Sequence, residues 1–295
     1  MEKRALGNTG MDVTVLGYGG AEIGYRGVPE ETVERLINGA LDAGLNIIDT
    51  AECYVDSEEK IGKVASRRRN EYFLFTKCGH DNDGDHWNPK KMAEQIDRSL
   101  QRLQTDRVDL LQLHSCSEEQ LRQGDVIEVI QRARKAGKTR FIGYSGDGQA
   151  ALHAVQSGIF DTLQISVSIA DQEALDLVLP AAKAKGIGVI AKRPIANAIW
   201  NESSKPAEYY QPYWERLHLL DYDFLRANSG QDVATALRFT LSAEGVHTAI
   251  VGTTKPERWK QNAELLRGGP LDSQIFNAIR SRWRSVAAPD WVGQT

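Results

Sequence analysis

The sequence of 295 residues is dominated by a steady alternation of short apolar runs and longer amphipathic runs. The short runs are typical of buried strands, and the longer runs, with apolar residues three and four apart, are typical of helices. Strict alternation of the two predicts a parallel sheet with right-handed crossovers. After a first strand near residue 16, the expected strands are 46–50, 72–77, 108–114, 139–145, 162–168, 187–192 and 247–252. The expected helices are 30–43, 57–67, 89–103, 121–136, 148–157, 173–185, 230–243 and 256–267.

The number of repeats distinguishes two kinds of parallel sheet. Eight strand-then-helix units in roughly 250 residues favour a closed α/β barrel, the (β/α)8 TIM barrel, over an open doubly wound sheet. The turn signal Asn8-Thr9-Gly10 predicts an N-terminal β-hairpin that plugs the barrel bottom, and 272–286 predicts an extra C-terminal helix. Because no linker-like segment interrupts the series, we expect a single barrel domain, residues 1–295.

The spacing of the glycines after the first strand shows whether the chain has the fingerprint of an open, dinucleotide-binding sheet. After Gly17 and Gly19, the third glycine of the G-x-G-x-x-G fingerprint would stand at position 22, which is Glu22. The fingerprint fails, and only a close approach of the backbone to a ligand remains as an interpretation.

Composition excludes several classes of partner. The net charge is −4 and no long basic run occurs, so we expect no nucleic-acid partner. No apolar stretch is long enough for a membrane span or a secretory signal. Cys53, Cys78 and Cys116 are odd in number and lack C-x-x-C spacing, which predicts a reducing cytoplasm and no metal site. All three lie close to polar strand ends, where Lys77 could lower a thiol pKa and make activity sensitive to oxidation.

Three consecutive strands end in polar residues. Asp49 ends the run 46–50, Lys77 ends 72–77 and His114 ends 108–114, while Tyr54 follows Asp49 across a short polar turn. In a parallel barrel the C-terminal ends of the strands face one mouth, where catalytic residues collect. A buried Asp–Lys ion pair with a core Tyr and His is the structural alternative.

These residue types suit the reduction of a carbonyl. Hydride addition leaves an alkoxide, so a proton donor must lie beside the oxygen. A phenol donates reluctantly at its reference pKa of about 10. A nearby ammonium would lower that pKa, and a carboxylate would hold the ammonium in place. Tyr54 is then the expected general acid, with Lys77 lowering its pKa, Asp49 holding Lys77, and His114 bonding the substrate oxygen.

In these contexts Asp49, Tyr54, Lys77 and His114 resemble the catalytic tetrad of the aldo-keto reductases. Those enzymes are (β/α)8 barrels that use a nicotinamide cofactor without a Rossmann fold. The resemblance covers almost the whole chain and includes Leu16-Gly17-Tyr18-Gly19, Gly143-Tyr144-Ser145, Gln164, Ala236-Leu237-Arg238-Phe239 and Ile250-Val251-Gly252-Thr253. It implies an NADPH-dependent oxidoreductase that reduces aldehydes or ketones to alcohols by hydride transfer.

The resemblance also implies positions for the nicotinamide. Ser145 and Gln164 match the family residues that bind its carboxamide. The family usually has Asn after that Ser, where this chain has Gly146. After the seventh strand the family commonly places an aromatic ring against the nicotinamide, whereas this chain has Lys192 and Arg193. Arg193 could stack its guanidinium on the ring or reach the pyrophosphate.

A second cofactor region is implied where the last strand meets a helix N-terminus, a geometry that suits phosphate. Thr253 and Arg258 match family residues on the 2′-phosphate, and Asn262 matches the adenine contact. Gly252 stands where some members have a phosphate-binding Lys, and Lys255 nearby could compensate. Two cations favour NADPH, with NADH possible; an ordinary solvated helix end is the alternative.

The substrate pocket is expected to have aromatic walls. Tyr25, Trp87 and Trp200 lie in loops predicted at the same mouth, although each is equally compatible with a packing role. Specificity is expected in the loop 194–228 and in the C-terminal tail, which carries Trp291.

Two other functions fit parts of the pattern. A Schiff-base lyase would use Lys77 as its nucleophile. A nicotinamide-binding, redox-sensing regulatory subunit with little turnover would retain the tetrad, since the aldo-keto reductase family includes channel-associated subunits.

Overall fold

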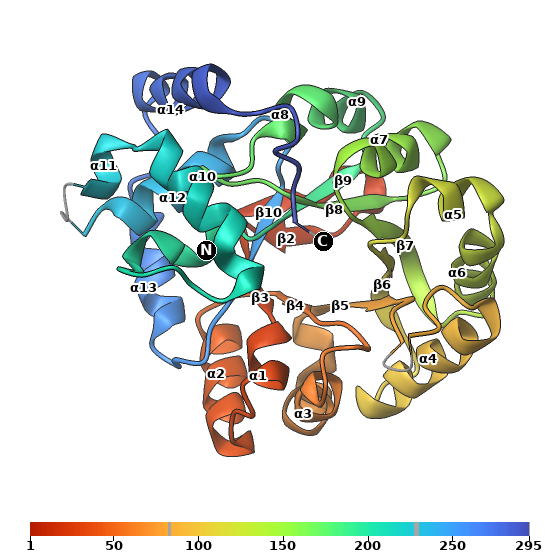
Figure 1. Ribbon diagram of the computed structural model, residues 1–295. Helices are drawn as coiled ribbons and strands as arrows, with labels where there is room; N and C mark the ends of the chain where they lie inside the picture. Colours follow the sequence, from red (N-terminus) through yellow and green to blue (C-terminus); the bar gives the residue numbers. More distant parts are fainter. Residues whose placement is uncertain (82–83, 227–229, 295) are drawn as a thin grey trace.

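The computed structural model describes residues 1–81, 84–226 and 230–294, and it has the closed parallel barrel that the alternation predicts (Figure 1). Neighbouring strands pair in chain order, and the last strand closes the ring by pairing with the first. The eight barrel strands are β3 (Leu16–Gly19), β4 (Ile47–Asp49), β5 (Phe73–Cys78), β6 (Val108–His114), β7 (Thr139–Ser145), β8 (Thr162–Ser166), β9 (Gly188–Lys192) and β10 (Thr248–Gly252).

The register of these strands determines which side chains share a level at the C-terminal rim. Lys77 of β5 lies beside Gln112 of β6, and Ser145 of β7 lies between His114 of β6 and Gln164 of β8. Polar residues that lie between positions 77 and 164 of the sequence are therefore brought to one end of the barrel.

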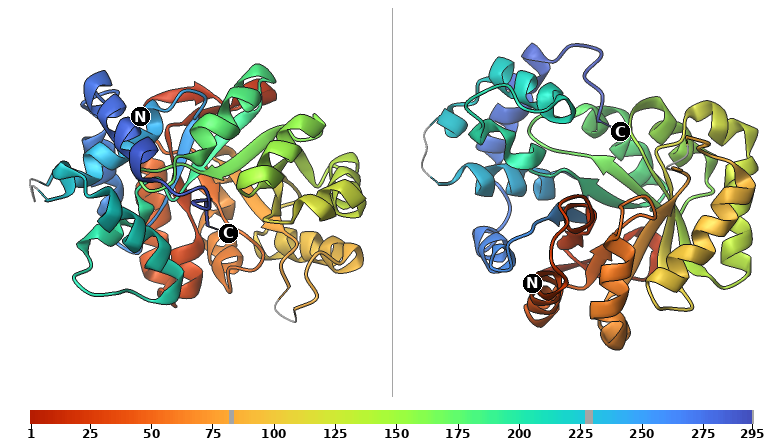
Figure 2. Two further views of the ribbon diagram at one scale, coloured as in Figure 1. Left: turned by 45° about the horizontal axis from the view of Figure 1, so that its top comes forward. Right: turned by 60° about the horizontal axis from the view of Figure 1, so that its bottom comes forward.

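Helices surround the barrel (Figure 2). They form because each has one apolar stripe: on α4, for example, Met92 and Ile96 are buried, and Asn88 caps its N-terminus by accepting from two backbone N–H groups. The helices are α1 (Ala21–Tyr25), α2 (Glu30–Asp42), α3 (Ser57–Ala65), α4 (Pro89–Arg102), α5 (Glu118–Gln123), α6 (Asp125–Lys135), α7 (Gly148–Ser157), α8 (Glu173–Leu177), α9 (Leu179–Ala184), α10 (Gln211–Leu220), α11 (Asp223–Arg226), α12 (Asp232–Ser242), α13 (Arg258–Leu265) and α14 (Ser273–Val286). None of those described is both long and apolar enough to cross a membrane.

Two segments predicted as single helices are each divided in two. The helix expected at 121–136 begins earlier and breaks at Gly124, whose φ of 88° is left-handed. The helix expected at 173–185 breaks at Val178, just before the turn that contains Pro180. Proline has no N–H to continue the hydrogen-bond ladder, so the helix restarts there.

The predicted hairpin, β1 (Lys3–Ala5) and β2 (Asp12–Thr14), closes the N-terminal end of the barrel. Leu6, Met11 and Val13 are buried against side chains from the starts and interiors of five strands, in a cluster completed by Ile47, Phe75, Leu110, Ile190 and Ile250. The extra helix α14 packs against α10 over a second cluster that includes Tyr213 and Trp283.

Glu58 of α3 is a carboxyl buried behind β5. Its Oε1 accepts a hydrogen bond of 2.6 Å from Thr76, whereas its Oε2 has no hydrogen-bond partner among the described residues. Burial raises the pKa of Glu58 to about 7. The folded protein therefore holds this proton more tightly than the unfolded chain does.

We expect Glu58 to lower the free energy of unfolding as the pH rises from about 4.5 to about 7, because a carboxyl with a raised folded-state pKa destabilises the fold once it must ionise. Glu58→Gln, neutral at every pH, should weaken this fall and should be more stable than the wild type at pH 8, by up to about 3 kcal/mol. Urea unfolding at pH 5 and pH 8 measures the effect, and the exposed Glu94→Gln is the control. An unchanged pH dependence in Glu58→Gln would contradict the assignment.

Candidate active site

A buried ion pair forms the base of the site. The Lys77 ammonium donates to Asp49 Oδ2 at 2.6 Å and to the Thr50 carbonyl at 2.8 Å, and Asp49 and Lys77 are only 3% and 2% exposed. The Gln112 amide lies 3.5 Å from the other Asp49 oxygen and 3.3 Å from Gln164 Oε1. Each charge is thus paired and hydrogen-bonded, the arrangement under which buried charges are tolerated.

Tyr54 lies directly above this pair. Its ring centre is 5.2 Å from the Lys77 ammonium and 5.7 Å from the His114 ring. A tight turn holds it: Tyr54 N–H donates to Ala51 O, and Tyr54 O accepts from Ser57 N–H. Gly24 of α1 presses against the same carbonyl so closely that a Cβ there would overlap it. The three side chains predicted at separate strand ends, and Tyr54 after the first of them, lie together at one rim.

The electrostatics of Tyr54 differ from the expectation. Burial, followed by the charge of Asp49, raises the pKa of Tyr54 well above its ordinary value. The pKa of Tyr54 is therefore raised on balance, whereas the sequence predicts a lowered one. The physical reason is that Asp49 neutralises most of the ammonium's field, and desolvation of a phenolate outweighs what remains.

His114 is a neutral imidazole at neutral pH. Burial, then Lys77 and His80, lower its pKa well below the ordinary value. Its Nδ1 lies 3.5 Å from Cys53 Sγ, and its ring packs 4.8 Å from His80. A neutral ring can donate one hydrogen bond to a ligand oxygen without adding a charge.

The thiols are not activated. Burial raises the pKa of Cys53 to about 11, although Lys77 acts in the opposite direction. Cys78 and Cys116 are buried, and burial raises their pKa values too. The prediction of a thiol with a lowered pKa beside Lys77 is therefore wrong.

The described residues contain no group of three His, Cys, Asp or Glu arranged to hold a metal ion.

Ser145, at the end of β7, and Gln164, in the middle of β8, are buried side by side. Next to them Lys192 forms an ion pair of 2.8 Å with Asp147, which the sequence analysis did not single out. Arg193 follows with a left-handed φ of 54°, and its guanidinium donates to the hydroxyls of Tyr209 and Ser166. The wall where the family usually has an aromatic ring is cationic here.

The second predicted cofactor region lies where β10 runs into α13. Gly252 is so close to Glu22 that a Cβ would stand 3.0 Å from its Cγ. Thr253 Oγ1 accepts from Lys255 N–H at 3.1 Å, Arg258 begins the helix, and Asn262 is buried on it. Within the described ranges neither Lys255 nor Arg258 forms an ion pair, so both cations are available to an anion.

The three predicted pocket residues lie in different settings. Tyr25 is 61% exposed, and its ring packs 5.6 Å from Tyr54. Trp87 packs on His80, which in turn contacts His114. Trp200 belongs to the second hydrophobic cluster, and its indole N–H donates to Asp232 of α12.

Sequence reasoning missed several residues of this rim, among them Gln112, Asp147 and Tyr209. Gln112 carried a usable signal, because it is a polar residue inside an otherwise apolar strand. Asp147 and Tyr209 carried no such sequence signal. Asp147 follows Gly146 in a turn, and Tyr209 lies in the long loop 194–228.

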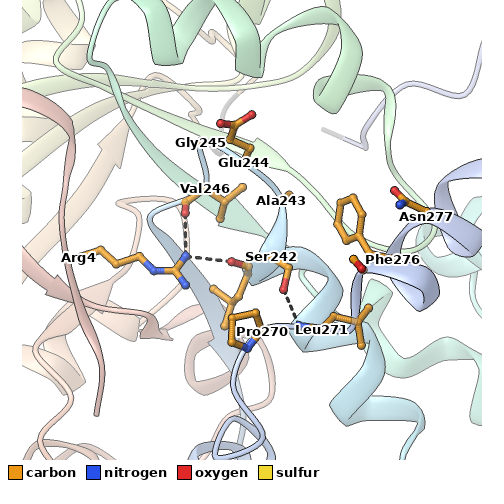
Figure 3. A pocket seen from close by; sticks show the side chains of 12 residues that line it. Arg4, Ser242, Ala243, Glu244, Gly245, Val246, Pro270, Leu271, Phe276 and Asn277 are labelled. Carbon is orange, nitrogen blue, oxygen red and sulfur yellow. Dashed lines mark hydrogen bonds between the residues drawn. The ribbon is translucent and has the colours of Figure 1, made fainter.

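A separate cavity of about 440 Å³ lies at the other end of the barrel, next to the hairpin (Figure 3). Arg4 reaches into it and donates to the carbonyls of Leu241 and Val246, while Ser242 accepts from Leu271 N–H. The Arg4 contacts tie the hairpin to the barrel, a structural role distinct from the rim.

Comparison with known proteins identifies the family and the fold. The sequence signature of the aldo/keto reductase family matches residues 15–284. L-galactose dehydrogenase of Arabidopsis thaliana is 30% identical over 99% of this chain and 97% of that protein. D-threo-aldose 1-dehydrogenase of a Pseudomonas species is 25% identical over 88% of this chain and 91% of that protein. The holo form of aldo-keto reductase AKR11C1 from Bacillus halodurans superposes with a TM-score of 0.83, at 25% identity, over 99% of both chains.

The family match covers nearly the whole barrel, the strands close in the same way, and the four rim side chains converge. This chain belongs to the aldo/keto reductase family of oxidoreductases.

Proposed function

We propose that this protein is an NADPH-dependent reductase of aldehydes and ketones in which Tyr54 is the general acid. The observation that supports it most is the Asp49–Lys77 ion pair directly beneath the Tyr54 ring, with neutral His114 next to it. A general acid needs a proton at the working pH and a fixed position beside the reacting oxygen. The raised pKa of Tyr54 supplies the first, and the tight turn at 51–57 supplies the second.

The proton moves from Tyr54 to the carbonyl oxygen as that oxygen gains negative charge. An alkoxide is far more basic than a phenolate, so a phenol with a raised pKa still gives up its proton. Lys77 stabilises the phenolate that remains, and Asp49 keeps Lys77 charged and in place. His114 holds the carbonyl oxygen by a hydrogen bond, without the charge that would compete with Lys77.

The residues fit a nicotinamide dinucleotide phosphate, which when bound supplies the hydride. Ser145 and Gln164 offer adjacent polar groups for its carboxamide. Arg258, at the N-terminus of α13 and without an ion pair among the described residues, suits the 2′-phosphate, with Thr253 and Lys255 beside it. Asn262 would contact the adenine. Lys192 and Arg193 would face the pyrophosphate. Ring stacking at position 192 does not fit, because Asp147 already pairs with that lysine.

We propose that Tyr25 and Trp87 line the substrate pocket. Trp200 would contribute from a loop farther from Tyr54. The names of two relatives, L-galactose dehydrogenase and D-threo-aldose 1-dehydrogenase, suggest sugars as the first substrates to try. The three free thiols support the proposed cytoplasmic setting.

The proposal is tested by measuring turnover of nitrobenzaldehyde and a panel of aldoses with NADPH and with NADH. We expect steady-state turnover, faster at low cofactor concentration with NADPH. Cofactor binding without turnover of any carbonyl at high enzyme concentration would instead favour the regulatory, redox-sensing function.

Arg258→Ala should weaken NADPH binding about 10- to 100-fold, the loss expected for a charge-assisted bond to a phosphate. Binding of NADH, which lacks the 2′-phosphate, should hardly change. Lys260→Ala, an exposed cation on the same helix, is the matched control. Equal losses for both cofactors would show that Arg258 does not read the 2′-phosphate.

A further inference from the structure

The C-terminal tail, residues 290–294, leaves α14 and returns across the molecule to the barrel rim, where it ends near β8 and β9 (Figures 1 and 2). Trp291 anchors it, packing against Trp283 at 5.3 Å and beneath the Arg216 guanidinium at 5.4 Å. Arg216, which also pairs with the buried Asp171, donates to the Val292 carbonyl at 2.8 Å. The tail is thus a docked segment rather than a loose end.

The tip of the tail binds the cations that follow β9. The Gln294 carbonyl accepts hydrogen bonds from both Lys192 and Arg193. Lys192 has a counterion in Asp147, but Arg193 has no carboxylate partner in the described part of the chain. Its acceptors are three neutral oxygens, those of Ser166, Tyr209 and Gln294. A guanidinium pairs more strongly with an anionic oxygen than with a neutral carbonyl, so an anion would bind better in the place that Gln294 fills.

One feature of the docked tip allows it to fit, and another opposes docking. Gly293 fits only because it lacks a side chain: a Cβ would stand 2.5 Å from the Asp147 carboxylate and 2.8 Å from Ser166 Cβ. The Gln294 Nε2 is buried and has no hydrogen-bond partner among the described residues. An unsatisfied buried donor weakens the state that contains it. The docked tip is therefore well anchored at Trp291 and poorly stabilised at Gln294.

We propose that the tail is an intramolecular competitor for the cofactor site, in which the Gln294 carbonyl holds Lys192 and Arg193 until an anionic nicotinamide cofactor displaces it. The proposal rests on the proposed function, because it takes Lys192 and Arg193 as part of the cofactor site. A protein whose binding-competent state is only partly populated binds its ligand more weakly by that fraction. The tail therefore sets the cofactor concentration at which the enzyme becomes loaded.

The test compares NADPH binding to three variants by calorimetry. A chain that ends at Asp290 should bind NADPH about 10-fold more tightly or better, since no tail remains to be displaced. Gly293→Val, which keeps the tail but cannot seat its tip, should show a similar gain. Gln294→Ala retains the backbone carbonyl that makes the contacts and should bind NADPH no more tightly than the wild type. Circular dichroism confirms that each variant is folded.

The outcomes separate the two proposals. If the shortened chain and Gly293→Val bind NADPH no more tightly than the full chain, the tail does not compete and this inference is overturned, whereas the proposed function stands. If neither the full chain nor the shortened chain binds any nicotinamide cofactor, the proposed function fails as well. Digestion of the full chain with carboxypeptidase adds a second readout: saturating NADPH should speed release of the C-terminal residues, and slower release would mean that the tail closes over the cofactor instead.

Discussion

Replacing Tyr54 with Phe should lower the rate of carbonyl reduction by about 10²- to 10⁴-fold, the usual contribution of a positioned general acid. The substitution removes one hydroxyl and keeps the ring that packs against His114 and above Lys77. Affinity for NADPH should stay the same, because the residues proposed to bind it lie on β7 to β10 and α13. The loss should therefore appear in kcat, with little change in the dissociation constant of the cofactor.

The matched control is Tyr72→Phe, which also removes a single buried hydroxyl but at the start of β5, where it bonds Ala65 O. A comparable loss of rate in both variants would point to general destabilisation.

The pH profile of the wild type is a second test of the role of Tyr54. Alcohol oxidation needs the phenolate of Tyr54, and a raised pKa keeps that form scarce at neutral pH. The oxidation rate should thus climb steadily with pH, whereas reduction should stay nearly level around neutral pH.

Replacing Lys77 with Met should abolish most activity, by about 10²-fold or more, and should also destabilise the fold. Burial raises the pKa of Asp49, and Lys77 is the principal group that pulls it back. Without the ammonium, an isolated carboxylate remains in a site that is almost closed to water. Breaking a buried pair in this way costs about 3–5 kcal/mol, which urea unfolding would measure.

The double variant Asp49→Asn with Lys77→Met separates the two effects. It removes both charges, so most of the lost stability should return, because the penalty comes from the charge left unpaired and not from the absence of the pair. Activity should not return, since Tyr54 still lacks the cation that stabilises its phenolate. A double variant as unstable as Lys77→Met would mean that the pair does not account for the stability loss, and recovered activity would remove Lys77 from the mechanism.

Much of the barrel could be predicted because local patterns and the global fold agree. The strands 108–114 and 139–145 and the helix 148–157 have the bounds expected from their apolar spacing. Asp49, Lys77 and His114 could be placed because each ends an apolar run, and a parallel barrel brings such ends together. Tyr54 could be placed because it follows Asp49 across a short turn. The single-domain expectation stays a prediction.

What escaped prediction depends on long-range packing. Arg193, Ala196, Asn197 and Ala198 all have left-handed backbone conformations, which non-glycine sequences do not signal. The pKa of Tyr54 depends on how completely the surrounding loops exclude water, and the hydrophobic pattern does not measure that. The docking of residue 294 on β9 joins positions about a hundred residues apart, and neither end carries a local motif for it.

The hairpin that fills the floor of the barrel has a consequence for the order of events during turnover. Because Leu6, Met11 and Val13 close that end, the cofactor and the substrate both have to approach from the opposite rim. When the cofactor and the substrate approach from the same rim, the one that lies deeper has to bind first and dissociate last.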